Sequence, residues 1–241
     1  MRILLSTLFF LLTTYFGSFL SATSPDKQGL HESGDVYRKE PDSTDNYNLY
    51  NGRVWRSLYA RVRGDEFLFI GDFQPGTVKL NDKLFNNVEV RYDIYHDEVL
   101  IRKNQGIILQ LNKEMVNSFT IDFNNKTYYF QNMGASDTNE INGYVNILYQ
   151  GDVSLLVKYK KEIFPLAVEN RYDLFSQSNR MFLRKDGLLF SIGRKNDIIK
   201  LFEADKQQIR SFIKSRKLKV SKKKPESFVP VVDFCNSLYI R

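Results

Sequence analysis

Cysteine is almost absent from this 241-residue sequence, which holds only Cys235. One cysteine cannot form a disulfide within the chain. Many small secreted domains depend on disulfides because they bury too little apolar surface to be stable without them. This chain therefore has to be held together by its own core, and about 190 folded residues bury enough surface for that.

Long hydrophobic runs are also lacking, apart from one at the start of the chain. Arg2 is followed by an uncharged, largely apolar run from Ile3 to Leu20, then by Ala22 and polar sequence. This layout is typical of a secretory signal peptide. We predict a signal peptide over residues 1–22, removed by cleavage, and no transmembrane segment in the mature chain. The alternative is an uncleaved anchor, because the run nearly reaches the roughly 20 residues that span a bilayer.

Export combined with the lack of disulfides indicates a bacterial envelope protein. We expect the mature protein in the periplasm or at the cell surface of a bacterium. Residues 23–50 carry only three aliphatic side chains, Leu30, Val36 and Leu49. Such a segment buries too little to offset its ordering entropy, so we interpret it as a flexible tether.

Residues 51–193 show no long helical period and instead alternate apolar with polar side chains. The run from Phe119 to Phe123 alternates in this way, and Asn124-Asn125 after it predicts a two-residue hairpin, as does Asp186-Gly187. Further turns are predicted at Pro75-Gly76, His96-Asp97 and Gln150-Gly151-Asp152. The predicted fold class is mainly β (α+β): an antiparallel curled sheet, sandwich or small barrel of roughly nine or ten strands, with two or three short C-terminal helices.

Residues 194–241 change to a helical period. An apolar stripe predicts a first helix around Ile198, and Asp205 is placed to cap a second helix, with Gln208 as its capping-box partner. A third helix is predicted from about Ser227. We expect the apolar stripes of these helices to pack on the sheet.

Positive charge is concentrated in the same segment. Residues 194–224 hold twelve Lys or Arg against three Asp or Glu, whereas residues 23–193 hold 21 basic and 23 acidic side chains. In the second predicted helix, four basic residues recur at helical spacing and fall on one face: Lys206, Arg210, Lys214 and Lys217.

This basic face is the candidate binding site for an anionic partner, namely an anionic lipid, lipopolysaccharide or an acidic protein. Each such charge near an anionic surface contributes about 1 kcal/mol of attraction. The alternative is a solvated helix face that only keeps the protein soluble. Export argues against nucleic acid as the partner, despite the basic charge.

Catalytic motifs are missing. The patterns G-x-S-x-G and H-E-x-x-H, the P-loop and the calcium loop do not occur. His96 lies at a predicted turn beside Asp97 and Glu98, with Asp93 three residues earlier, and consecutive turn residues point in different directions. We therefore expect a solvated polar turn there rather than a metal site. Cys235 lies on an apolar helical face and is expected to be a small buried hydrophobe. The sequence thus predicts no metal, no cofactor and no catalytic residue.

Two runs resemble segments of uncharacterised exported β-rich proteins of Gram-negative bacteria. They are Pro75-Gly76-Thr77-Val78 and the run from Asn87 to Glu98, and the tail from Lys200 to Leu238 is similar in style. The resemblance covers most of residues 51–241. It implies an envelope location, but no assigned activity and no functional residues.

The sequence therefore predicts an exported, non-enzymatic envelope protein with a binding or interaction role, whose basic C-terminal helix face meets an anionic partner. Two alternatives stay open. One is a periplasmic carrier that holds a lipid or other apolar ligand between sheet and helices. The other is a glycan hydrolase with carboxylates that the sequence does not identify.

Overall fold

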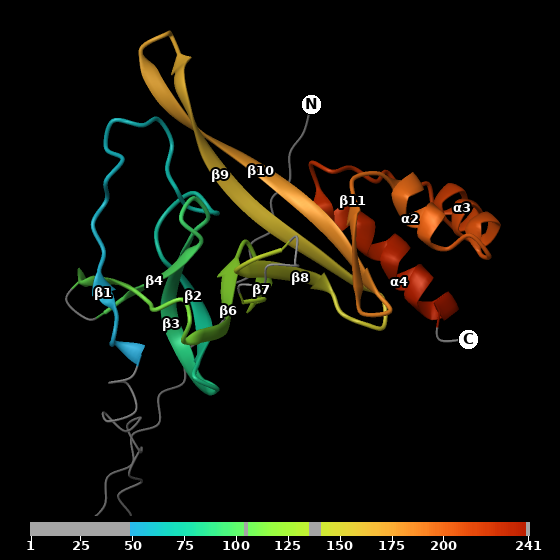
Figure 1. Cartoon of the computed structure of the whole chain (residues 1–241), viewed down its shortest axis with the longest axis horizontal. Helices are drawn as coiled ribbons and strands as arrows, with labels where there is room; N and C mark the ends of the chain where they lie inside the picture. The colour runs from blue at the N-terminus through green and yellow to red at the C-terminus, as the bar shows by residue number, and fades with distance from the viewer. Residues whose placement is uncertain (1–48, 104–105, 135–140, 240–241) are drawn as a thin grey trace, which may run out of the picture. The chain divides into compact units, whose positions relative to one another are not determined.

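The computed structural model describes residues 49–103, 106–134 and 141–239 (Figure 1). The predicted signal peptide, and the predicted tether up to residue 48, lie outside the described residues. Leu49 and Tyr50, which we assigned to the tether, belong instead to the folded part. Leu49 is buried and Tyr50 packs against the same core. These two side chains are apolar enough for their burial to outweigh the cost of ordering the chain there.

Eleven strands form one antiparallel sheet in the order β1-β5-β4-β3-β2-β6-β7-β8-β9-β10-β11. Their bounds are β1 Arg53–Val54, β2 Gln74–Leu80, β3 Lys83–Asp93, β4 Glu98–Arg102, β5 Ile108–Gln110, β6 Val116–Phe123, β7 Lys126–Asn132, β8 Tyr144–Tyr149, β9 Ser154–Val168, β10 Tyr172–Lys185 and β11 Leu188–Ile192. The mainly β prediction is confirmed. Among the described strands the two edges, β1 and β11, do not pair, so the barrel alternative is wrong and the sheet is open.

Tight turns connect the strands where the sequence predicts them. Asn124 and Asn125 join β6 to β7 with φ of 51° and 59°, and Asp186 and Gly187 join β10 to β11 with φ of 54° and 73°. Two successive residues with positive φ are the requirement of a type I′ hairpin turn, which Asn, Asp and Gly meet at the lowest steric cost. Both predicted hairpins are therefore confirmed.

The turn predicted at Pro75-Gly76 is wrong, because both residues lie inside β2. The two residues pair only with β3, since the pairing of β2 with β6 begins at Val78. Proline is tolerated there because no ladder hydrogen bond to its nitrogen is required. A Cβ on Gly76 would lie 2.1 Å from the carbonyl oxygen of Thr120, so this glycine permits a close approach of β6 rather than a turn.

The helices follow the sheet: α2 spans Lys195–Leu201, α3 Lys206–Ser215, the 3-10 turn η2 Pro225–Phe228 and α4 Val229–Tyr239. Figure 1 shows them grouped at the β8–β11 end of the sheet, where α4 contacts β8 and β9 and α2 contacts β11. Asp205 occupies the N-cap position of α3 as predicted, but its side chain makes no capping hydrogen bond. The capping box is not formed, because the Gln208 side chain donates to Asp205 Oδ1 at 3.2 Å instead of to the backbone.

The sheet is apolar on both faces near these helices. Leu155 and Val157 of β9 lie in the main core, whereas Leu156 between them packs in a smaller cluster with Phe182. The helices add nine buried residues to the main core: Ile198, Ile199, Phe202, Ile209, Ile213, Phe228, Val231, Val232 and Cys235. The position of α2 and α3 is therefore fixed by the same core that holds the strands.

Candidate functional site

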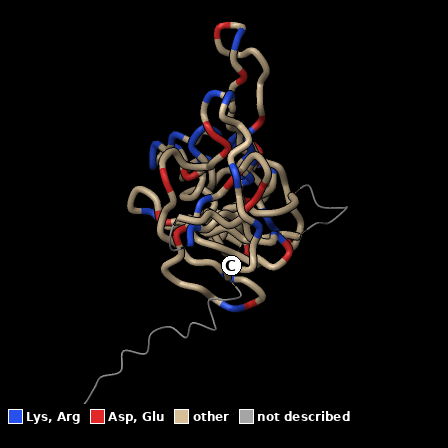
Figure 2. Tube along the Cα trace, turned by 90° about the vertical axis from the view of Figure 1, so that its left-hand side faces the viewer, with Lys and Arg blue, Asp and Glu red and all other residues tan. Residues whose placement is uncertain are grey.

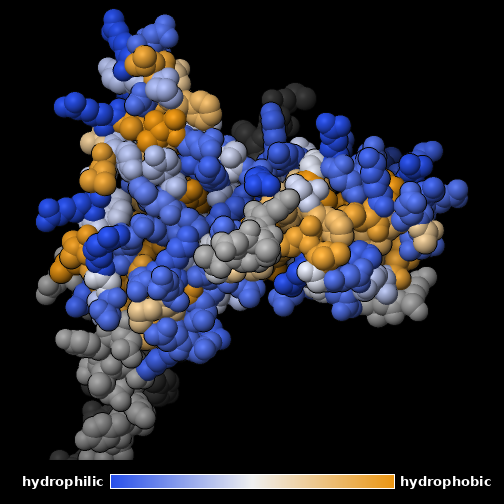
Figure 3. All heavy atoms as spheres, in the orientation of Figure 1, coloured by the Kyte–Doolittle hydropathy of each residue, from blue (hydrophilic) through white to orange (hydrophobic). Residues whose placement is uncertain are grey.

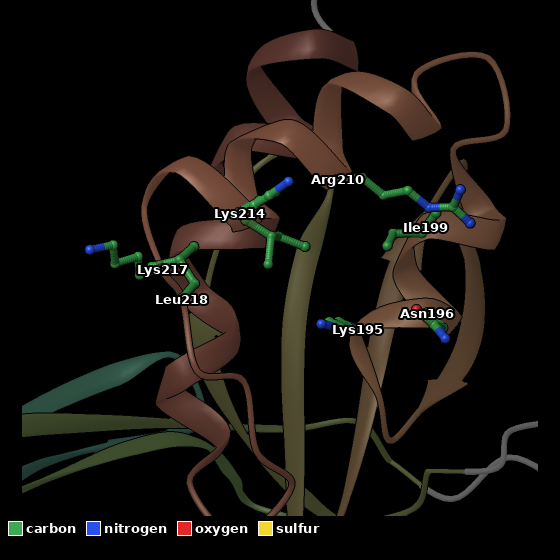
Figure 4. A pocket seen from close by; sticks show the side chains of 8 residues that line it. Lys195, Asn196, Ile199, Arg210, Lys214, Lys217 and Leu218 are labelled. Atoms are coloured by element: carbon green, nitrogen blue, oxygen red, sulfur yellow. The ribbon is translucent and has the colours of Figure 1, made fainter.

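The candidate site is a pocket of about 550 Å³ between α2 and α3 (Figure 4). Its lining residues are Lys195, Asn196, Ile199, Arg210, Ile213, Lys214, Lys217 and Leu218. Figure 4 shows that they come from α2, from α3 and from the chain directly after α3. Four lining side chains are cations and none is acidic. The site thus combines concentrated positive charge with three aliphatic side chains.

The amphipathic character of α3 decides which side chains face this pocket. Ile209 is completely buried and Ile213 is 6% exposed, while Arg210 and Lys214, one turn apart, are exposed. A helix that buries its apolar stripe presents the opposite stripe to solvent. The ring of Phe212 also stacks on Phe234 of α4, which holds α3 in one rotational setting.

The end of α3 brings two further residues to the pocket. Arg216 is the C-cap, and Lys217 after it has a left-handed φ of 51°. The Leu218 N–H donates to the Ile213 carbonyl at 3.0 Å, and the Lys217 N–H donates to the Lys214 carbonyl at 3.1 Å. This pair of bonds is a Schellman motif, which reverses the chain and packs the residue after it against the last turn. Lys217 therefore reaches the pocket from beyond the helix and not from its face.

A carboxylate fixes the start of α2 on the other side of the pocket. Asp197 Oδ2 accepts hydrogen bonds from the N–H groups of Gly193 and Arg194, both at 2.9 Å. An acidic side chain in the first turn satisfies free backbone donors and complements the helix dipole. Because Ile199 anchors the same helix in the core, Lys195 is held at the rim of the pocket.

The four cations of the pocket have no charge partner in the described part of the chain. Lys195, Arg210, Lys214 and Lys217 form no ion pair and no side-chain hydrogen bond there. Like charges gathered without counter-charges raise the local positive potential and attract anions. The arrangement is therefore suited to binding an anionic group.

The sequence prediction and the observed pocket overlap in part. Arg210, Lys214 and Lys217 line it, whereas Lys206, at the start of α3, does not. The sequence did not predict Lys195 as a site residue. Helical spacing relates only residues of the same helix, and Lys195 lies on α2 whereas the predicted basic face lies on α3. The high basic content of residues 194–224 was the only signal for it.

A second polar cluster surrounds His96 in the turn after β3. His96 Nδ1 lies 2.7 Å from Asp93 Oδ2, and Nε2 lies 2.9 Å from the hydroxyl of Tyr59. The N–H groups of Tyr95 and His96 donate to Asp93 Oδ1, both at 2.9 Å. A ligand-type atom from each of Asp93, His96 and Glu98 lies within 4.8 Å of the others. The expectation of a solvated turn is wrong for Asp93, which is completely buried because it caps the turn.

The electrostatics of this cluster do not favour nucleophilic catalysis. Burial raises the pKa of both Glu66 and Glu98, and the nearby Asp93 charge raises the two pKa values further. Burial also raises the pKa of Tyr59, which makes its phenolate harder to form. Both ring nitrogens of His96 and both oxygens of Asp93 are already engaged in the hydrogen bonds described above. The cluster is thus best explained as a satisfied structural network.

Cys235 lies on α4 and is completely buried in the main core. Burial raises the pKa of its thiol to about 12. Because the thiolate is the reactive form of cysteine, this residue is inert at neutral pH. The prediction of a small buried hydrophobe is confirmed.

Comparison with family models, curated proteins and solved structures gives no match for this chain. Within the described residues, no helix combines the length and the apolar character needed to cross a membrane.

Proposed function

We propose that this is an exported, non-catalytic binding protein of a bacterial envelope, and that the pocket between α2 and α3 takes the negative charge of its partner. One observation carries the proposal: four cations from two helices and a turn, none of them paired within the described residues, line one pocket that has no acidic lining residue. Each cation close to an anionic surface adds about 1 kcal/mol of attraction.

The other lining residues favour a particular class of partner. Ile199, Ile213 and Leu218 lie in the same pocket as the cations. An acidic protein needs only the charges, whereas an amphiphile with a phosphate group and acyl chains also uses aliphatic contact surface. Leu218 offers most of this surface, because Ile199 and Ile213 are each only 6% exposed, so the charges carry most of the fit to lipopolysaccharide or another anionic lipid.

The two alternatives have less support. A carrier would hold its ligand between sheet and helices, yet Phe228, Val231 and Cys235 fill the helix side of that contact and are completely buried. A glycan hydrolase needs two accessible carboxylates flanking the substrate. Glu66 and Glu98 line one pocket beside His96, but Glu66 is only 4% exposed, so this cluster does not offer two accessible carboxylates.

Titration with purified lipopolysaccharide at low and at high salt tests the proposal. We expect measurable binding at low salt that weakens strongly as salt is raised, because exposed charge pairs are screened. Binding that persists unchanged at high salt would favour the carrier. A protein that binds no lipopolysaccharide and no anionic lipid at low salt would contradict the proposal.

A further inference from the structure

The outer part of the β9–β10 hairpin lies beyond the neighbouring strands. The two strands pair with each other from Ser154/Arg184 out to Val168/Tyr172. β8 pairs only with Leu155–Val157 of β9, and β11 pairs only with Met181–Lys185 of β10. The hairpin therefore continues as a two-stranded ribbon, held to the rest of the protein by the Lys161 N–H, which donates to the Ile94 carbonyl, and by the β-bridge of Arg63 with Leu174.

The tip of this ribbon exposes large apolar side chains. Phe164 is 49% exposed, Leu166 57% and Tyr172 38%, and Pro165 and Ala167 between them are exposed as well. Figure 3 shows hydrophobic surface on this hairpin alongside hydrophilic groups. Scattered exposed apolar residues need no explanation, but exposed apolar side chains gathered near the end of one hairpin are candidates for an interaction surface.

Backbone strain accompanies the exposure of one of these residues. Leu166 has a φ of 51°, a left-handed conformation that is unfavourable for a residue with a branched side chain. The Leu166 N–H donates to Asp173 Oδ1 at 3.0 Å, and the pairing of β9 with β10 shifts register at this bulge. Asn or Gly would adopt this backbone at lower cost. We therefore take this strained, solvent-exposed leucine as a candidate contact point for a partner outside the chain.

Three arginines lie beside the apolar tip. A pocket of about 670 Å³ is lined by Arg61, Arg63 and Arg171, together with Tyr172 and Asp173. The Arg63 N–H donates to the Asp173 carbonyl at 2.8 Å, so the loop that carries Arg61 and Arg63 is tied to the hairpin. Planar guanidinium groups are well suited to phosphate because they can donate two parallel hydrogen bonds.

The charges of the tip leave a small basic excess, because Arg61, Arg63 and Arg171 outnumber Glu169 and Asp173. Figure 2, in which the hairpin stands at the top, shows both basic and acidic residues along it. Glu162 pairs with Lys160 at 2.8 Å, and Asp173 already accepts from the Leu166 N–H. Arg61 and Arg171 form no ion pair and no side-chain hydrogen bond in the described residues. Their guanidinium groups are therefore available to an external anion.

We propose that the tip of the β9–β10 hairpin docks the protein onto the surface of an anionic phospholipid bilayer. Phe164, Leu166 and Tyr172 enter the boundary between headgroups and acyl chains, as apolar anchors of peripheral proteins do. Arg61, Arg63 and Arg171 hold the lipid phosphates beside them. In the described residues Arg61 and Arg171 form no ion pair, while the guanidinium of Arg63 lies 4.4 Å from the ring centroid of Tyr172. An apolar tip with this basic excess complements an anionic bilayer, which offers both acyl chains and phosphates, better than it complements a second copy of the same basic tip.

Co-sedimentation with phospholipid vesicles tests this docking. We expect the wild-type protein to bind vesicles of phosphatidylglycerol and phosphatidylcholine, and to bind pure phosphatidylcholine far more weakly. Leu166→Asn should reduce the vesicle partition coefficient at least about tenfold, since one inserted leucine is lost. Its thermal stability should be equal or higher, because Asn tolerates the left-handed backbone. The control Leu84→Asn removes a leucine that is 56% exposed at another hairpin and should bind like wild type.

Further substitutions test the role of the arginines and the alternative explanations of vesicle binding. Arg61→Gln with Arg171→Gln should weaken binding about 25-fold, whereas Lys126→Gln, in the β6–β7 hairpin, should change it little. Lys195→Glu with Lys214→Glu alters the pocket between α2 and α3 and should leave hairpin docking largely intact. A loss of anion binding in the pocket can therefore be distinguished from a loss of hairpin docking. Equal losses for Leu166→Asn and Leu84→Asn, or full competition by soluble glycerophosphate, would overturn the docking. A dimer that dissociates in Leu166→Asn without any vesicle binding would show that the tip pairs two copies of the chain instead.

Discussion

Phe212 of α3 stacks on Phe234 of α4, with ring centroids 4.1 Å apart and planes within 1° of parallel. This contact sets the rotation of α3, so it also decides which way Arg210 and Lys214 point. Phe212→Ala should lower the free energy of unfolding by about 2 kcal/mol, because an aromatic pair and part of its burial are lost. It should also weaken anion binding although no charge changes. Chemical denaturation and lipopolysaccharide titration of the same variant measure the two effects. Weaker stability with unchanged binding would mean that the stack does not position the cations.

Asp97 holds two lysines and a tyrosine at the β3–β4 turn. Its Oδ1 accepts from Lys158 Nζ at 2.7 Å and from the Tyr92 hydroxyl at 2.5 Å, and its Oδ2 accepts from Lys113 Nζ at 2.6 Å. The Asp97 and Lys158 side chains are only 19% and 20% exposed.

Asp97→Asn should therefore destabilise the protein by about 3 kcal/mol, because the ammonium of Lys158 is left largely buried without a counter-charge. Asn is compatible with the φ of 62° at this position, so backbone strain does not add to the effect. Adding Lys158→Met should recover part of the loss. Urea denaturation of the single and double variants measures this coupling. A double variant no more stable than Asp97→Asn alone would show that the buried lysine is not the cause.

Glu66 makes stability depend on pH with a definite sign. It is 4% exposed, and burial raises its pKa above the usual 4.5. A carboxyl group whose pKa is raised in the folded state costs nothing well below 4.5, costs progressively more as the pH rises from 4.5 to the folded pKa, and costs the full amount above it. Glu66→Gln should thus be more stable than wild type at pH 7, and the difference should shrink as the pH is lowered toward 4. Thermal melts across this range test the sign, with Glu114→Gln, at an exposed position, as the control for removing one charge. A difference that grows on acidification would contradict this account of Glu66.

Cys235 should resist thiol reagents as long as the protein is folded. Its thiol is completely buried, and burial raises its pKa to about 12. Maleimide labelling followed by mass spectrometry should show almost no modification in buffer and full modification in denaturant. Rapid labelling of the native protein would mean that α4 leaves the core frequently.

The sequence predicted local features of this fold better than long-range ones. The turns at Asn124-Asn125 and Asp186-Gly187 could be predicted because positive φ is a property of the residues themselves. Pro75-Gly76 was misread because the need for glycine comes from the Thr120 carbonyl of a strand more than forty residues away. The close approach of the Thr120 carbonyl to Gly76 has no signature in the sequence around Gly76.

The same distinction applies to the candidate site. Arg210 and Lys214 were found from the helical period, since they lie on one helix face. Lys195 joins them only because the main core packs α2 beside α3. Lys217 has the right spacing but reaches the pocket through the Schellman turn after the helix, and Lys206 has the right spacing yet lies outside the pocket.

Charge reversal inside and outside the pocket tests the central claim most directly. Lys195→Glu with Lys214→Glu changes two lining residues, and Lys222→Glu with Lys223→Glu makes the same change of net charge at two exposed residues that do not line it. Lipopolysaccharide binding of the two double variants is then compared at low salt. The account predicts that the pocket variant loses most of its affinity, on the order of 1000-fold, because attraction is replaced by repulsion at two positions, while the control loses much less. Equal losses in both variants would contradict the account, because they would show that overall charge and not the pocket attracts the anion.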